Sequence, residues 1–327
     1  MQLSIIIPYY NIEDKYMFRC LSNVFSLEIP RNEYEIILVD DGSTRPPQKA
    51  KAHYEKNKRT VWLSQPHRGL GSARNLGIMH AQGEHILFLD SDDYLYRGTL
   101  PPVLAHATKS GCDILRFAYR PCTSMQEETA TQPDKIVFTP PMGGNNYLRT
   151  HHVPSMACIY IFKRSLCTGI NLQFAEKGFI EDEVFTAILH YNARRIVETN
   201  TIVYAYYNRP GSITQSNSPK RIEALTRYHF KAINDLYEYT RQQRAMRRPI
   251  QGLERKLKGL TIDFVRRIVI QEKWKPVWKE YLPKLKSLKL FPIHGANFTF
   301  KHRIFSILAN TVLGRNLLHE LLKRGIH

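Results

Sequence analysis

The sequence contains no segment suited to crossing a membrane or to directing secretion. No apolar run approaches the roughly 18 residues that a membrane-spanning helix needs. The chain starts with Met1-Gln2-Leu3 and passes directly into Ser4-Ile5-Ile6-Ile7, without a basic region, a long apolar region or a small-residue cleavage site. We therefore expect neither a transmembrane helix nor a signal peptide.

Cysteines are few and scattered. The chain has five of them, with no Cys-x-x-Cys pair. An odd number without paired spacing predicts neither a disulfide framework nor a zinc site, and it is typical of a reducing cytosol. The sequence therefore predicts a cytoplasmic protein.

Acidic residues are scarce in the last third of the chain. Residues 220–327 contain 24 Lys and Arg against 8 Asp and Glu, whereas residues 1–219 contain 23 against 21. We therefore expect an α/β domain over residues 1–218 and a basic helical region over 219–327. Such a basic region indicates an anionic partner, which can be a membrane lipid, a nucleic acid or a phosphorylated substrate. No known nucleic-acid-reading motif is present, so we expect no nucleic-acid partner.

Short apolar runs alternate with helical patterns through the first hundred residues. Residues 3–8, 34–39, 60–63 and 86–89 are predicted strands, joined by short segments with helical spacing. This alternation predicts a mostly parallel, doubly wound sheet. In such sheets ligands bind outside the carboxyl ends of the strands.

Three polar loops follow predicted strands, at residues 8–11, 40–44 and 90–93. In the last of them Asp90, Asp92 and Asp93 repel one another unless a cation lies between them. Mg²⁺ or Mn²⁺ takes oxygen ligands, commonly carboxylates and the phosphates of a substrate. The alternative is an ordinary acidic surface turn.

A glycine-rich turn, Gly69-Leu70-Gly71, leads into a predicted helix that carries Arg74. It matches neither the dinucleotide fingerprint nor the P-loop. It can be a tightly packed helix start, or it can bring Arg74 to a diphosphate.

Four segments together resemble the family 2 glycosyltransferases, which have the GT-A fold. They are Ser4–Asn11 (SIIIPYYN), Val39–Ser43 (VDDGS), Ala73–Gly77 (ARNLG) and Leu89–Asp93 (LDSDD). Their order and spacing match over roughly residues 3–110. The resemblance implies a nucleotide-sugar donor, an Asp-x-Asp metal motif and inversion at the anomeric carbon.

The resemblance also implies roles for individual residues. Arg74 would contact the donor diphosphate, Asp90 would lie near the ribose or the sugar, and Asp92 with Asp93 would hold Mn²⁺ or Mg²⁺. Asp41 would accept a hydrogen bond from uracil. The other residues that we place on the donor side are Pro8, Tyr9, Tyr10, Asn11, Ser91 and Arg209. For Arg209, which follows a predicted strand over residues 195–207, a phosphate contact and a plain turn remain open.

A second acidic cluster, Glu181-Asp182-Glu183, precedes a helical pattern. Acids at this position can simply cap the helix. Inverting sugar transfer instead needs a carboxylate that removes the proton of the acceptor hydroxyl. The resemblance places this base on Asp182, and we place Glu181 and His152 on the acceptor side.

The basic region shows amphipathic helical patterns in which Trp274 and Trp278 lie among lysines. Aromatic and aliphatic residues opposite Lys and Arg are typical of interfacial helices, so we expect peripheral binding to an anionic membrane. The Gln-x-x-Arg-Trp motif of processive family 2 synthases is absent, which favours the addition of single sugars.

The sequence therefore predicts an inverting, metal-dependent glycosyltransferase. It would move a sugar from a UDP-hexose or UDP-N-acetylhexosamine to a hydroxyl of a lipid-linked saccharide, in polysaccharide biosynthesis at the inner face of the bacterial cytoplasmic membrane. One alternative is a sugar-phosphate nucleotidyltransferase. The other is a non-enzymatic protein that binds membrane or nucleic acid through its basic tail.

Overall fold

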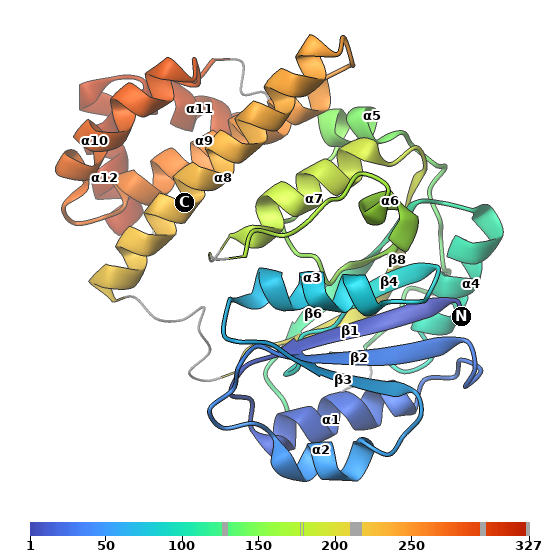
Figure 1. Cartoon of the computed structure of the whole chain (residues 1–327). Helices are drawn as coiled ribbons and strands as arrows, with labels where there is room; N and C mark the ends of the chain where they lie inside the picture. The colour runs from blue at the N-terminus through green and yellow to red at the C-terminus, as the bar shows by residue number, and fades with distance from the viewer. Residues whose placement is uncertain (126–129, 177, 179, 210–217, 295–298, 325–327) are drawn as a thin grey trace. The chain divides into compact units, whose positions relative to one another are not determined.

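The computed structural model describes the chain except residues 126–129, 177, 179, 210–217, 295–298 and 325–327. The chain divides into two compact units (Figure 1). The first unit contains Met1–Tyr147 and Val153–Ser216. The second contains Leu148–His152 and Asn217–His327.

The first unit is built on an eight-stranded sheet in the order β3-β2-β1-β4-β7-β6-β8-β5. Strands β3, β2, β1 and β4 pair in parallel, as the sequence predicts. The strands are β1 (Leu3–Tyr9), β2 (Tyr34–Asp40), β3 (Thr60–Ser64), β4 (His85–Phe88), β5 (Tyr94–Leu95), β6 (Ile114–Cys122), β7 (Tyr160–Lys163) and β8 (Ile196–Tyr207).

The second half of the sheet is mixed rather than parallel. Strand β7 runs antiparallel to both β4 and β6, and β5 runs antiparallel to β8, while β6 and β8 are parallel. The regular strand–helix alternation that produces parallel pairing occurs only up to β4. The fold is therefore α/β with a mixed sheet. The parallel part of this sheet carries the loops that the sequence predicts to bind the donor.

Strand β1 lies at the centre of the parallel part, and all seven of its residues are buried. It includes Pro8, which was expected to end it. Proline is tolerated there because β4 pairs with β1 only as far as Ile6, so no ladder bond to β4 is lost. The strand therefore reaches Tyr9, and the polar loop begins at Tyr10.

Helices cover both faces of the parallel part. Figure 1 shows α1 and α2 on one face and α3 on the other. Helix α3 packs closely because Gly71 lies where an added Cβ would collide with the backbone of Ala175, which agrees with the tight-packing interpretation of the glycine-rich turn. The helices up to β8 are α1 (Asp14–Phe25), α2 (Gln48–Tyr54), α3 (Leu70–His80), α4 (Leu100–Ser110), α5 (Gly144–Thr150), α6 (Arg164–Thr168) and α7 (Glu181–Asn192).

The second unit consists mainly of helices packed around α9. They are α8 (Pro219–Ala245), α9 (Gln251–Val269), α10 (Trp274–Ser287), α11 (Phe300–Ala309) and α12 (Val312–Lys323). Phe264 on α9 is fully buried, with its ring centroid 5.8 Å from that of Phe230 and 5.2 Å from that of Tyr281. No helix in the described part of the chain has both the length and the apolar character required to span a bilayer.

The two tryptophans of the basic region belong to this interior. Trp274 and Trp278 are each only 5% exposed, and the Arg315 guanidinium lies 4.6 Å from the Trp278 ring centroid. The lysines around these tryptophans suggested that the rings face a membrane surface. The rings instead face the neighbouring helices of the second unit.

Candidate active site

Arg74 on α3 joins carboxylates from two distant parts of the first unit. Its guanidinium is 2% exposed and pairs with Asp182, with Asp90 at 3.2 Å and with Glu181 at 3.6 Å. Asp90 follows β4, whereas Glu181 and Asp182 begin α7. The structure thus brings together the two acidic clusters that the sequence singled out. Arg74 is already surrounded by three carboxylates. A donor diphosphate, its expected partner, would have to compete with these carboxylates for the guanidinium.

Asp182 is held in a fixed orientation. One oxygen accepts from Arg74 and the other accepts from the Ala157 amide at 3.1 Å. A carboxylate has about four acceptor positions, so it can also accept from a substrate hydroxyl. Burial raises the pKa of Asp182, and Arg74 opposes that rise. The arrangement suits a carboxylate that takes a proton while its position stays constant.

Glu181 lies beside Asp182 with its side chain 9% exposed. Burial, followed by the charge of Asp182, raises the pKa of Glu181 to about 7. The folded protein therefore holds a proton there between about pH 4.5, the ordinary value, and about pH 7. The raised pKa of Glu181 therefore increases the free energy of unfolding. This increase is complete below pH 4.5 and is lost as the pH rises through 7.

We expect Glu181→Gln to become more stable relative to the wild type as the pH is raised from 5 to 8. The amide cannot ionise, so the variant avoids the cost that the buried carboxylate incurs at high pH. Thermal unfolding at several pH values measures the difference in Tm. A difference that is constant across this range would contradict the raised pKa.

Asp93 is bound inside the first unit, which differs from its expected role as a metal ligand. Its side chain accepts from the Tyr204 hydroxyl at 2.5 Å and from the Tyr207 amide at 2.7 Å, and the residue is 1% exposed. Its own amide donates to the Asp90 carbonyl at 2.9 Å and closes the turn. Asp93 therefore fixes the Asp90–Asp93 loop to β8, and we do not include it among the proposed metal ligands.

Tyr204→Phe should lower the free energy of unfolding by about 1–3 kcal/mol, because one oxygen of a buried carboxylate would lose its donor. The ring still fills its place in the core. The Asp90 amide donates to the same hydroxyl at 3.1 Å, so the change removes both of these hydrogen bonds. Urea unfolding of the wild type and the variant measures this difference. An unchanged midpoint would show that Asp93 does not depend on the tyrosine.

Asp92 and Asp90 are the two partly accessible acids of this loop. Its side chain is 24% exposed and accepts from the Arg209 Nε at 3.0 Å, while the Asp90 side chain is 28% exposed. Burial, followed by the charge of Asp90, raises the pKa of Asp92. The described residues contain no group of three or more His, Cys, Asp or Glu arranged to hold a metal. Two carboxylates fit a Mg²⁺- or Mn²⁺-type ion whose remaining ligands are substrate phosphates and water.

Asp41 is engaged with a neighbouring loop rather than open to a base. Its carboxylate accepts from the Gln65 side chain at 2.7 Å and from the amides of Arg68 and Gly69 at 2.9 and 2.8 Å, and His67 Nδ1 lies 2.8 Å away. The residue is 3% exposed. The expected hydrogen bond to uracil would have to compete with these donors, so the structure gives Asp41 a positioning role for residues 65–69.

The loop after β1 separates its two tyrosines. Tyr9 is 5% exposed, whereas Tyr10 is 40% exposed and stacks on His67 with ring centroids 4.2 Å apart. Asn11 lies in the left-handed region at φ 50°, and its side-chain Oδ1 accepts a hydrogen bond from the Arg45 backbone amide at 2.9 Å. Of the two, Tyr10 is the ring that offers a surface to a ligand.

The remaining predicted residues have different positions. Ser91 is buried in the Asp90–Asp93 turn, and Pro8 is buried in β1. His152 is exposed and belongs to the second unit, so its acceptor contact stays a prediction. Arg209 is the last described residue before a gap, and residues 210–214 of its expected loop lie outside the described residues.

Comparison with known proteins identifies the family of the chain. The sequence pattern of Glycosyl transferase family 2 matches residues 4–167, which is half of the chain. The chain belongs to glycosyl transferase family 2. The match includes Arg74 and the Asp90–Asp93 loop and ends before α7.

The individual relatives share less than a third of their aligned residues with this chain. The poly(ribitol-phosphate) beta-N-acetylglucosaminyltransferase TarS of Staphylococcus aureus is 29% identical over 216 residues, covering 63% of this chain and 35% of that protein. The uncharacterized glycosyltransferase EpsJ of Bacillus subtilis is 29% identical over 220 residues, covering 65% and 63% of the two chains. The chain therefore spans about a third of TarS and somewhat less than two thirds of EpsJ.

Solved structures of related glycosyltransferases share the fold. Residues 1–349 of S. aureus TarS align with a TM-score of 0.69 at 18% identity, covering 99% of this chain and 92% of that one. The mannosyltransferase PcManGT from Pyrobaculum calidifontis, in complex with GDP-Man and Mn²⁺, aligns with a TM-score of 0.50 at 16% identity, covering 98% and 88%. The expected GT-A fold with a helical C-terminal region is thus confirmed.

Several residues of this family 2 site were not anticipated from the sequence. They are Arg19, which donates to the Asp92 carbonyl, the Asp41 partners Gln65 and His67, and the Asp93 partners Tyr204 and Tyr207. Only their three-dimensional neighbours reveal them, because no short motif links them to the acids.

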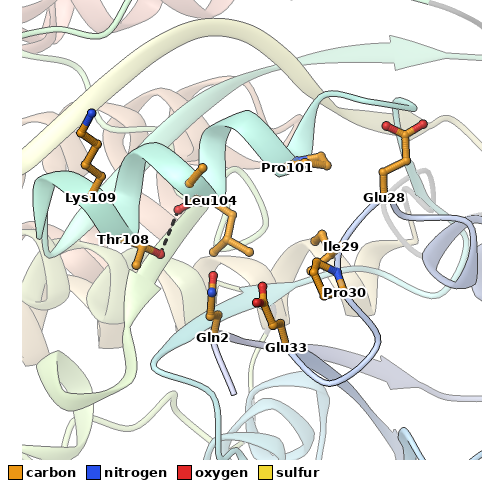
Figure 2. Close-up of a pocket in the computed structure, with 10 residues that line it drawn as sticks. Gln2, Glu28, Ile29, Pro30, Glu33, Pro101, Leu104, Thr108 and Lys109 are labelled. Atoms are coloured by element: carbon orange, nitrogen blue, oxygen red, sulfur yellow. Dashed lines mark hydrogen bonds between the residues drawn. The ribbon is translucent and has the colours of Figure 1, made fainter.

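A cavity of about 350 Å³ lies elsewhere on the first unit (Figure 2). Gln2 and Glu33, which line it, directly precede β1 and β2. It is therefore at the amino ends of the parallel strands, opposite the edge where the acidic loops leave the sheet. Of its charged residues, Glu28 and Lys109 are exposed to solvent and Glu33 is half-buried, and the cavity lies away from the acidic loops, so we assign it no role in the reaction.

Proposed function

We propose that this chain is an inverting glycosyltransferase that uses a nucleotide-sugar donor. Family 2 membership supports the reaction class. The observation that carries the proposal is the connection of Asp90 and Asp182 through buried Arg74. Through Arg74, the donor-side acid Asp90 and the candidate base Asp182 lie close together. Direct displacement at a sugar carbon needs donor and base to be close in this way.

In this proposal Asp182 removes the proton of the acceptor hydroxyl as that oxygen attacks the anomeric carbon. The bond to the donor diphosphate breaks on the opposite side, so the configuration is inverted. Arg74 and the Ala157 amide keep the carboxylate in place. The positive charge of Arg74 also favours the ionised form that a base needs.

We propose that Asp92, with Asp90, binds Mn²⁺ or Mg²⁺ together with the donor phosphates. Their exposure and oxygen ligands support this, as does the Mn²⁺ in the structure of PcManGT. The ion would neutralise the charge that develops on the leaving diphosphate. Asp92 and Asp90 would hold the ion, and the hydrogen bonds of Asp93 to Tyr204 and Tyr207 of β8 keep their loop in position.

We propose a UDP-hexose or UDP-N-acetylhexosamine as donor and a lipid-linked saccharide as acceptor. Relatives named for N-acetylglucosaminyl and glucosyl transfer support this range of sugars. The names of these relatives also mention poly(ribitol-phosphate), an anionic polymer, and a chain with net charge +18 suits an anionic acceptor assembly or membrane surface.

The experiment that tests this function measures what leaves the donor. Purified protein is incubated with Mn²⁺, a panel of UDP-sugars and lipid-linked saccharide acceptors, and the released UDP and the anomeric configuration of the product are recorded. The proposal predicts UDP release and inversion with at least one pair. A sugar-phosphate nucleotidyltransferase would instead release pyrophosphate from UTP and a sugar phosphate. Pyrophosphate without UDP would overturn the proposal.

A further inference from the structure

Helices α11 and α12 carry an unusual concentration of exposed apolar side chains. Among the described residues, six of the sixteen exposed large hydrophobic residues lie between positions 300 and 317. They form what we call the apolar edge: Phe300 (76% exposed), Ile304 (42%), Ile307 (60%), Val312 (65%), Leu313 (83%) and Leu317 (49%). A concentration of exposed apolar surface of this kind marks a site of interaction.

The edge is part of an ordered helical hairpin. Thr299 caps α11 by accepting from the His302 amide at 3.2 Å, and Thr311 caps α12 by accepting from the Gly314 amide at 3.0 Å. Gly314 lies so close to the Leu308 backbone that any added Cβ would collide with it. These contacts hold both helices in place while their apolar side chains point outward.

The opposite side of the same hairpin is packed within the second unit. Ala309, Leu318 and Leu322 are buried there. The Arg315 guanidinium donates to the Ala309 carbonyl at 2.7 Å. The hairpin therefore has two apolar sides, and only the inner one is covered by the second unit itself.

The charge around the apolar edge indicates what covers the outer side. Residues 299–324 contain five Lys and Arg and a single acidic residue, Glu320. Lys301, Arg303, Lys323 and Arg324 are exposed. With 24 Lys and Arg against 8 acids in residues 220–327, like charges oppose the approach of a second copy and favour an anionic surface.

We propose that the apolar edge inserts into the interfacial region of an anionic lipid bilayer while the surrounding cations contact the lipid headgroups. This combination of exposed aliphatic and aromatic residues with Lys and Arg is how interfacial helices bind. The inference rests on the proposed function and extends it, because a lipid-linked acceptor lies at such a surface. It assigns the docking to α11 and α12 rather than to the tryptophans of α10.

The test is co-sedimentation of the full chain with vesicles of phosphatidylcholine alone or with about 30% phosphatidylglycerol. The double variant Phe300→Gln/Leu313→Gln removes two exposed side chains from the edge. The matched control is Met79→Gln/Met246→Gln, which makes the same change at side chains that are 73% and 62% exposed outside the hairpin. We expect binding to the anionic vesicles that falls at least about tenfold in the edge variant and stays unchanged in the control.

A second variant reports insertion without weakening the edge. In Leu313→Trp the added indole should shift its fluorescence to shorter wavelength when anionic vesicles are added, whereas Met246→Trp should show no shift. Equal sedimentation of the edge variant and the wild type would overturn the proposal. So would a wild-type oligomer, seen by sedimentation velocity, that the edge variant dissociates, because a second copy would then cover the edge. Sugar transfer to a water-soluble acceptor, measured in parallel, tests the proposed function independently.

Discussion

Asp182→Asn is expected to lower the rate of sugar transfer by about 10²- to 10⁴-fold, the usual contribution of a general base. The substitution keeps the size of the side chain and removes its ability to take a proton. Arg74 retains Asp90 and Glu181 as partners, so its position should persist. The loss should therefore appear in kcat, while UDP binding stays close to that of the wild type.

The control for this result is Glu183→Gln, which changes the neighbouring carboxylate on the same helix. Released UDP measures transfer, and calorimetry with UDP shows whether the donor site is intact. Thermal unfolding is needed as well, because the Ala157 amide donates to one carboxylate oxygen of Asp182 and the amide side chain of the variant has one oxygen fewer. Full activity in Asp182→Asn would remove Asp182 from the role of base.

Asp92→Asn should abolish the metal dependence of UDP binding and reduce UDP affinity in Mn²⁺ by about 10- to 100-fold. Asp92 is one of the two partly accessible carboxylates of the Asp90–Asp93 loop, and the amide lowers the negative charge that attracts the ion. Transfer should fall at least as far, since the leaving diphosphate would lose its counter-charge. Titration of Mn²⁺ followed by electron paramagnetic resonance, with and without UDP, measures the change.

Arg209→Gln is the matched variant for this prediction because it removes the other half of the same ion pair. Without Arg209, the Asp92 carboxylate loses the cation that it pairs with, and Mn²⁺ should bind more tightly than to the wild type when nucleotide is absent. Tighter binding in Arg209→Gln and weaker binding in Asp92→Asn would both follow from competition for one carboxylate. Weaker Mn²⁺ binding in Arg209→Gln would contradict that competition.

The local patterns of the sequence were sufficient for the parallel half of the sheet and for the loops at its edge. Buried runs such as β1 and β4 are recognisable because they are rich in apolar residues, and the polar loops that follow them mark the strand ends. The antiparallel placement of β7 was not predictable in this way, since two strands and two helices without regular alternation separate β4 from β7 along the chain.

The individual roles of the acids were harder to predict, because they depend on residues far along the chain. Asp92 and Asp93 are adjacent in sequence, yet Tyr204 and Tyr207 on β8 bind only the side chain of Asp93. Asp41 likewise looks like an open carboxylate in the sequence, until residues 65–69 are seen to surround it. The sequence shows that these carboxylates lie in turns after strands. It does not show which hydrogen-bond donors contact their oxygens, because those donors come from distant parts of the chain.

The same reason explains the basic region. Lysines around Trp274 and Trp278 suggested an exposed aromatic face, but the packing of α10 buries both rings. The apolar side chains that do face outward lie later, on α11 and α12. Helical spacing identifies an apolar stripe, and only the neighbouring helices determine whether that stripe is inside or outside.

The measurement that tests the central claim most directly is calorimetric titration of the wild-type protein with UDP, first in Mn²⁺ and then in EDTA, with Asp92→Asn alongside. The account predicts binding that requires Mn²⁺ in the wild type and that is about 10- to 100-fold weaker, without dependence on the metal, in the variant. Metal-dependent binding of GDP or dTDP in place of UDP would change the donor and leave the site as described. The absence of binding to any of these nucleotides would contradict the assignment of this edge of the sheet as a nucleotide-sugar site.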